Sequence, residues 1–154
     1  MRKMILMLCA SFLALTTEIT CVKAENEDFS EPNEETVLVF SLDSQAEEMQ
    51  FYDNEGLLTT VVVSDSSLDG IKTISLNNSH ISMSFKIYIS QEIIQKAYSG
   101  SYTIKDSTKV TGTSLKVDSV SQATYKVYGI YGNAAVTRWL RANIKNDNVV
   151  VTYR

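Results

Sequence analysis

One histidine, one proline and two cysteines occur in 154 residues, and each shortage excludes a class of protein. A nucleophile activated by imidazole has only His80 to use, and a zinc site has few ligands to draw on. Both cysteines, Cys9 and Cys21, lie in the first 24 residues, so a chain that loses this segment has no disulfide and no thiol chemistry. The six glycines form neither a P-loop nor a dinucleotide-binding pattern.

The first 24 residues are organised like a secretory signal peptide. Arg2 and Lys3 are followed by an uncharged apolar run of about 12 residues, from Met4 to Leu15. That run is shorter than the roughly 20 residues of a membrane helix. The sequence VKA, ending at Ala24, then offers small residues at the cleavage positions. We therefore expect cleavage after Ala24 and a secreted protein.

Cys21 offers a different interpretation, in which it carries the lipid of a bacterial lipoprotein. The three residues before it are Glu18, Ile19 and Thr20. An acidic side chain suits the apolar groove of the lipoprotein peptidase badly, so plain cleavage is favoured. Plain cleavage leaves the mature chain without a stable membrane anchor.

The expected mature chain is acidic. Cleavage removes three of 14 basic and one of 18 acidic residues, which leaves a net charge of 11 − 17 = −6. Such a chain repels phosphate backbones, so we expect no nucleic-acid partner. Residues 25–35, ENEDFSEPNEE, hold six of the acidic side chains and the proline. We expect a solvated, flexible leader here, with cation capture or spacing from the cell wall as the alternative.

From Thr36 onward, Val, Ile, Thr, Tyr and Ser dominate, and apolar and polar residues alternate with a period of two. The clearest case is residues 80–90, HISMSFKIYIS, where the odd-numbered positions are apolar and the even-numbered ones are His, Ser, Lys and Tyr. A helix would scatter those apolar side chains around its circumference. No alternation of strands and helices appears, so we predict one all-β domain over residues 36–154, an antiparallel sandwich or barrel-like fold of about 8–10 short strands.

Two details of the expected strands involve particular residues. We predict a break near Gly100 in the strand 93–104 and a bulge or bend at Gly112 in the strand 109–118. Residues 134–145 are predicted as a strand, and Asn146 and Asp147 as a two-residue link to the last strand.

Four segments occur in an order that resembles a known family: MQFYDNEGLLTTVVV, FKIYISQEIIQKAYS, SVSQATYKVYGIY and RANIKNDNVVVTY. Together they resemble an uncharacterised family of small secreted proteins of Gram-positive bacteria, a domain of unknown function. The resemblance covers residues 36–154. It implies no activity, cofactor or catalytic residue. The chain departs from the family at Asn146 and Asp147, where glycine is more usual.

Candidate catalytic groups are few. Alternation places His80 on the face of Ser82 and Ser84, so a Ser–His pair is conceivable, but a strand-end histidine is the simpler interpretation. Glu47 and Glu48 face opposite sides of a strand and cannot act as a pair.

Other acidic pairs lie in predicted turns or loops. Asp53 and Glu55 belong to a turn, and Asp65 and Asp69 are potential calcium ligands that lack the full calcium-loop spacing. We expect no metal and no cofactor.

The aromatic residues of the last third are the remaining lead. On the strand 134–145, Trp139, Arg141 and Asn143 share the face opposite Leu140. Either Trp139 fills a second apolar layer, or it projects beside Arg141 as an interface anchor that binds a protein or stacks on a sugar ring.

We therefore expect a secreted, non-catalytic β domain that binds an extracellular protein or an envelope glycan, with Trp139, Arg141 and Asn143 as candidate binding residues. One alternative is a small toxin or bacteriocin-like protein whose strands re-pair in membranes, although the charge of −6 opposes attraction to anionic lipid. The other is a hydrolase that uses an acid pair in a cleft.

Overall fold

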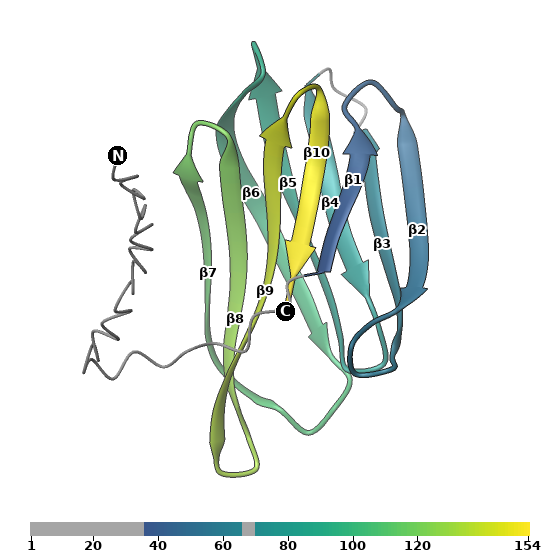
Figure 1. Cartoon of the computed structure of the whole chain (residues 1–154). Helices are drawn as coiled ribbons and strands as arrows, with labels where there is room; N and C mark the ends of the chain where they lie inside the picture. Colours follow the sequence, from purple (N-terminus) through teal and green to yellow (C-terminus); the bar gives the residue numbers. More distant parts are fainter. Residues whose placement is uncertain (1–35, 66–69) are drawn as a thin grey trace, which may run out of the picture. The chain divides into compact units, whose positions relative to one another are not determined.

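The computed structural model describes residues 36–65 and 70–154, which form antiparallel strands without a helix (Figure 1). The prediction of an all-β antiparallel fold is therefore confirmed. The expected signal peptide and acidic leader lie outside the described residues. Within those residues, nothing helical is long and apolar enough to cross a membrane.

The strands are β1 (Thr36–Ser41), β2 (Ala46–Tyr52), β3 (Leu58–Asp65), β4 (Ile71–Asn77), β5 (Ile81–Ser90), β6 (Ile93–Ile104), β7 (Lys109–Ser119), β8 (Gln122–Tyr131), β9 (Ala134–Lys145) and β10 (Asn148–Tyr153).

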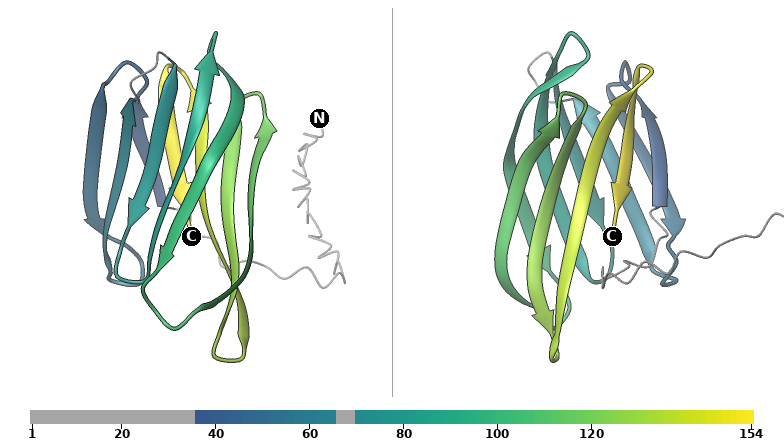
Figure 2. Two further views of the ribbon diagram at one scale, coloured as in Figure 1. Left: turned by 180° about the vertical axis from the view of Figure 1, so that it is seen from behind. Right: turned by 60° about the vertical axis from the view of Figure 1, so that its left-hand side comes forward.

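These strands form two five-stranded sheets that pack against each other (Figures 1 and 2). Sheet A has the order β1-β10-β9-β8-β7, and sheet B has the order β2-β3-β4-β5-β6. Each sheet has two edge strands, so neither is closed. The arrangement is the predicted sandwich and not the barrel-like alternative. Because β6 belongs to sheet B and β7 to sheet A, the chain crosses between the sheets through residues 105–108.

The core lies between the sheets and is filled by alternate residues of each strand. In β5, every second side chain from Ile81 to Ile89 is buried, as the period-two pattern predicts. Phe85 and Ile74 of sheet B meet Phe40 and Leu140 of sheet A in one cluster, all at 0% exposure. Burying such a side chain contributes about 1.5–3 kcal/mol, so this core is the main source of cohesion.

Two hairpins turn through non-glycine residues in the left-handed region. Asn146 and Asp147 have φ of 49° and 58°, and Gln91 and Glu92 have φ of 54° and 59°. Two consecutive positive φ values match the twist of the flanking strands. The predicted two-residue link at Asn146 and Asp147 is confirmed, and it forms without the glycine of the resembled family.

The predictions for Gly112 and Gly100 both fall at register shifts. The β7–β8 register shifts between Val110 and Gly112, which confirms the bulge. The break near Gly100 takes the form of a bulge: β6 continues through Gly100 as a strand, but the β5–β6 register shifts between Ser84 and Lys86, and Ser99 has φ of 55°. Glycine occupies this position because β6 of sheet B closely approaches a side chain of sheet A here. A Cβ on Gly100 would lie 2.9 Å from the ring of Tyr125, which is itself buried in sheet A.

The Gly100→Ala substitution is therefore expected to lower the free energy of unfolding by about 1–3 kcal/mol, since the buried Tyr125 ring has little room to move. Gly112→Ala is the matched control, because a Cβ there meets nothing within 4 Å. Urea unfolding followed by circular dichroism compares the two. Equal midpoints for both variants would contradict the close-packing account.

Candidate functional site

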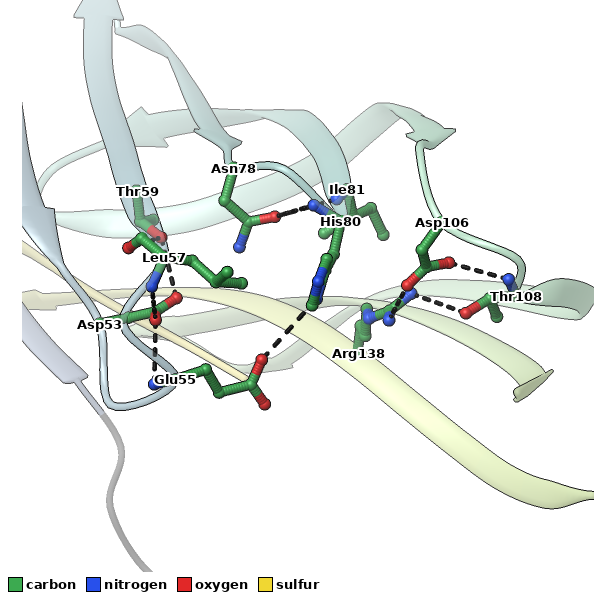
Figure 3. A network of polar contacts seen from close by, with 10 residues as sticks. All are labelled: Asp53, Glu55, Leu57, Thr59, Asn78, His80, Ile81, Asp106, Thr108 and Arg138. Carbon is green, nitrogen blue, oxygen red and sulfur yellow. Dashed lines mark hydrogen bonds and ion pairs between the residues drawn. The ribbon is translucent and has the colours of Figure 1, made fainter. Parts of the chain in front are cut away.

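A cavity of about 150 Å³ opens at one end of the sandwich, and we call it the end pocket. It lies where the β2–β3 turn, the β4–β5 turn, β9 and the last residues of the chain come together. Figure 3 shows most of the polar side chains around it. Its lining residues are Asp53, Asn54, Glu55, Leu76, Asn78, His80, Ile81, Arg138, Tyr153 and Arg154.

The floor of the end pocket is apolar and its rim is polar. Leu76, Ile81 and Tyr153 are buried core residues whose sides face the cavity. Above them lie two carboxylates, two guanidinium groups, one imidazole and two amides. A group that enters this cavity meets apolar surface below and hydrogen-bonding partners of both charges at the rim.

Two turns hold the rim through side chains that bind backbone N–H groups. Asp53 Oδ1 accepts hydrogen bonds from the backbone N of Glu55 at 3.0 Å and of Leu57 at 2.9 Å, and its Oδ2 accepts one from Thr59 Oγ1 at 2.9 Å. Asn78 Oδ1 accepts from the backbone N of His80, which precedes β5, and of Ile81, which begins it, both at 2.9 Å. This geometry explains why Asp and Asn occupy these positions, since their short side chains can cap their own turn.

His80 faces Glu55 across the mouth of the pocket (Figure 3), with 3.7 Å between its Nδ1 and Glu55 Oε2. The conceivable Ser–His pair is not assembled. β5 begins only at Ile81, so the alternation does not place His80 beside the serines, and Ser82 Oγ donates to Asn77 Oδ1 at 2.7 Å. Of the two interpretations, the strand-end histidine agrees with the structure.

Arg138 forms the far wall of the pocket and is held from behind by the β6–β7 crossing. Its Nη2 donates to Asp106 Oδ2 at 2.5 Å and its Nη1 to Thr108 Oγ1 at 3.1 Å (Figure 3). The side chains of Arg138 and Asp106 are only 19% and 12% exposed. Gly129 lets the crossing approach β8 closely, since a Cβ there would lie 2.5 Å from Thr108 Cγ2.

The surroundings of Asp106 change its acidity in two directions. Burial alone raises its pKa, because it disfavours the charged carboxylate. Hydrogen bonds from the hydroxyl and backbone N–H of Thr108, together with the contact to Arg138, outweigh burial and leave the pKa below its usual value. Asp106 is therefore ionised when the protein is folded at neutral pH, and its charge balances that of Arg138.

Asp106 should make the free energy of unfolding depend on pH in the acidic range. A pKa lowered by folding contributes stability that is present above the unfolded value of about 3.9 and is lost as the pH falls through the folded value. We expect Asp106→Asn to lower the free energy of unfolding by about 2–3 kcal/mol near pH 7, between the values for exposed and fully buried pairs.

Urea unfolding at several pH values measures this effect, with the exposed Asp43→Asn as the matched control. The gap between wild type and Asp106→Asn should narrow below about pH 4, as the wild-type carboxylate takes up its proton. A gap that stays constant down to about pH 2 would show that the charge of Asp106 is not what stabilises this end.

Asp65 and Asp69 are the acidic residues that the sequence offers as potential calcium ligands. Asp65 lies 2.6 Å from Nζ of the buried Lys72, and Asp69 lies outside the described residues. In residues 36–65 and 70–154, no three His, Cys, Asp or Glu side chains gather as metal ligands.

The structure places the three sequence-predicted binding residues away from the end pocket. Trp139, Arg141 and Asn143 lie on the outer face of sheet A, and Leu140 points into the core, as alternation predicts. Trp139 is only 5% exposed, and the guanidinium carbon of Arg141 lies 4.5 Å from the centre of its ring. Trp139 is therefore buried and does not project from this face, while the binding role of Trp139, Arg141 and Asn143 stays a prediction.

The sequence predicts the Asp53–Gly56 turn and offers His80 as a candidate residue. It does not predict that the segments lining the end pocket come together. Asp106 and Arg138 are 32 residues apart, and only the crossing between the sheets brings them together. One signal was available. Alternation placed Arg138 on the core-facing side of β9, where a charged side chain requires a partner.

Comparison with known proteins finds a similarity to a solved structure. No protein-family model and no curated protein matches the chain. Among solved structures, the 2.75 Å crystal structure of hypothetical protein lmo2686 from Listeria monocytogenes EGD-e is similar to this chain at a TM-score of 0.48 and 20% identity. The similarity covers 71% of this chain and 99% of that one, and no functional role is taken from it.

Proposed function

We propose that the mature chain is a secreted, non-catalytic binding domain and that the end pocket holds one group of an extracellular protein or envelope glycan. The supporting observation is the cavity itself, with its apolar floor and its rim of both charges. Its volume of about 150 Å³ equals that of a cavity that accommodates benzene and is smaller than a pocket for a drug-sized ligand. The pocket therefore takes a single ring or side chain as the anchor of a larger partner.

A binding role agrees with the contacts of the polar rim residues, because these contacts hold the backbone of the turns in place. Asp53 accepts three hydrogen bonds within its turn, and Asn78 caps the start of β5, so both hold backbone in place. An acid-pair hydrolase needs two carboxylates placed on either side of a substrate bond. That alternative has less support, since Asp53 belongs to the turn and Glu55 lies beside His80.

The toxin alternative also has less support, because re-pairing the strands requires opening a core that both sheets share. Our proposal includes export by cleavage after Ala24 and membership of an uncharacterised secreted family of Gram-positive bacteria. The four ordered sequence segments support that membership.

A substitution that fills the end pocket tests its proposed role in binding. The His80→Trp substitution places an indole at the pocket mouth and should weaken capture of a partner at least tenfold, because the anchor group can no longer enter. Tyr88→Trp is the matched control, since Tyr88 is an exposed side chain of β5, the strand that follows His80, and it does not line the pocket.

The measurement uses residues 25–154 as bait against protein and polysaccharide fractions of bacterial envelopes, followed by titration of the captured fraction. Nuclear magnetic resonance shifts with N-acetyltyrosine amide and N-acetylglucosamine then separate a protein anchor from a sugar anchor. Shifts should concentrate at Glu55, Asn78 and His80. Full capture by the His80→Trp variant would refute the role of the pocket.

A further inference from the structure

The β8–β9 hairpin continues beyond the neighbouring strands (Figures 1 and 2), and its tip has an unusual composition. Residues 127–137, VYGIYGNAAVT, contain no charged side chain, whereas 21% of the whole chain is charged. The chain reverses through Gly132, with φ of 60°, and Asn133. The tip is thus an uncharged projection from a charged protein.

Large apolar side chains are exposed on this tip. Ile130 is 41% exposed and Tyr131 is 51% exposed, and the smaller Ala134 and Ala135 beside them are exposed too. Ile130 pairs with Ala135 and Tyr131 with Ala134, so the two pairs present opposite faces of the hairpin. The tip is apolar on both sides, which suits a medium that surrounds it better than a groove that covers one side.

Cations lie at the base of the tip. Lys109 of β7 is the cross-strand neighbour of Ile130, and Lys126 is that of Trp139. Arg138 adds a third positive charge, which Asp106 balances, and Asp53 and Glu55 lie at the same end, in the end pocket that Arg138 also lines. An uncharged tip above two lysines complements a surface that is anionic outside and apolar inside, as the headgroup region of a bilayer is.

The backbone of the tip is hydrogen-bonded on its inner side. Cross-strand pairing continues from Tyr128 and Thr137 to Tyr131 and Ala134, whereas β10 stops opposite Leu140, so the outward-facing N–H and C=O groups of β9 at the tip need water or lipid headgroups as partners. Three residues of strand reach about 10 Å, enough to enter the headgroup region but not to span it. Tyrosine is enriched at that depth, because its ring is apolar and its hydroxyl stays in contact with water.

We propose that the β8–β9 tip docks the protein reversibly on anionic lipid surfaces. The net negative charge of the chain opposes attraction to anionic lipid, but its effect on this contact is reduced, because charges more than about 8 Å from the lipid are screened at physiological salt. Lys109 and Lys126 are the lysines at the base of the tip, beside the ion pair of Arg138 and Asp106. Docking through this tip is independent of what the end pocket holds.

The test is co-sedimentation of residues 25–154 with vesicles, either of phosphatidylcholine alone or with about 30% phosphatidylglycerol. Wild type should bind the anionic vesicles, and added salt should weaken binding. The Ile130→Ser and Tyr131→Ser double substitution should weaken it at least tenfold, because both apolar side chains are lost. The Lys109→Gln and Lys126→Gln double substitution should abolish the preference for anionic vesicles.

The matched control replaces Tyr88 and Ile93 with serine. Both are exposed apolar residues of similar size. Ile93 lies at the opposite end of the sandwich, because the backbone N of its neighbour Ile94 donates to Val120 O at the β7–β8 turn. This control should bind vesicles as wild type does. Urea midpoints confirm that all variants fold.

Three results would overturn the proposal: wild type that ignores both vesicle types, equal losses in the control and the tip variant, or a tip variant that binds vesicles normally. If vesicles are inert and the tip variant instead fails to capture an envelope protein, the tip is a protein-docking surface and the lipid proposal is wrong.

Discussion

The ion pair between Asp106 and Arg138 is the contact on which the arrangement of the pocket end depends. Asp106 belongs to the segment that carries the chain from sheet B to sheet A, and Arg138 belongs to β9 where the projecting hairpin begins. Removing two charges from water is costly, so such a pair is favourable only when its remaining hydrogen bonds are also made. Thr108 supplies them to both partners. The pair therefore fixes one wall of the end pocket and the base of the hairpin together.

Cohesion and positioning come from different parts of the molecule. The shared core of both sheets holds the sandwich together, and it contains no disulfide. Ion-paired cations order the two ends instead: Arg138, which is half-buried, at the pocket end and the buried Lys72 at the other. At the end opposite the pocket, Lys72 Nζ contacts Asp65 at 2.6 Å and the carbonyl oxygen of Ser44 at 2.9 Å. A binding site at such an end needs this kind of order, because turns alone are the least constrained part of a sandwich.

The strands and their faces could be predicted from the sequence because alternation is a local property. The strand at 80–90 and the faces of the strand at 134–145 follow from it, as does the two-residue link at Asn146 and Asp147. Features that depend on the opposite sheet could not be predicted. Gly100 reads as a strand breaker, yet it makes room for the ring of Tyr125. Alternation put Trp139 on the outer face, but only the fold shows Arg141 over its ring. The end pocket unites segments that no sequence spacing connects.

Hydrogen–deuterium exchange of the Arg138→Met variant against wild type tests most directly whether the ion pair orders this end. The substitution keeps an apolar stem and removes the charge. We expect faster exchange at the backbone N–H of Thr108 and at Gly129, while Ile74 and Phe85 in the centre of sheet B keep most of their protection. Exchange that is unchanged at Thr108, or that rises equally in the centre of sheet B, would contradict it.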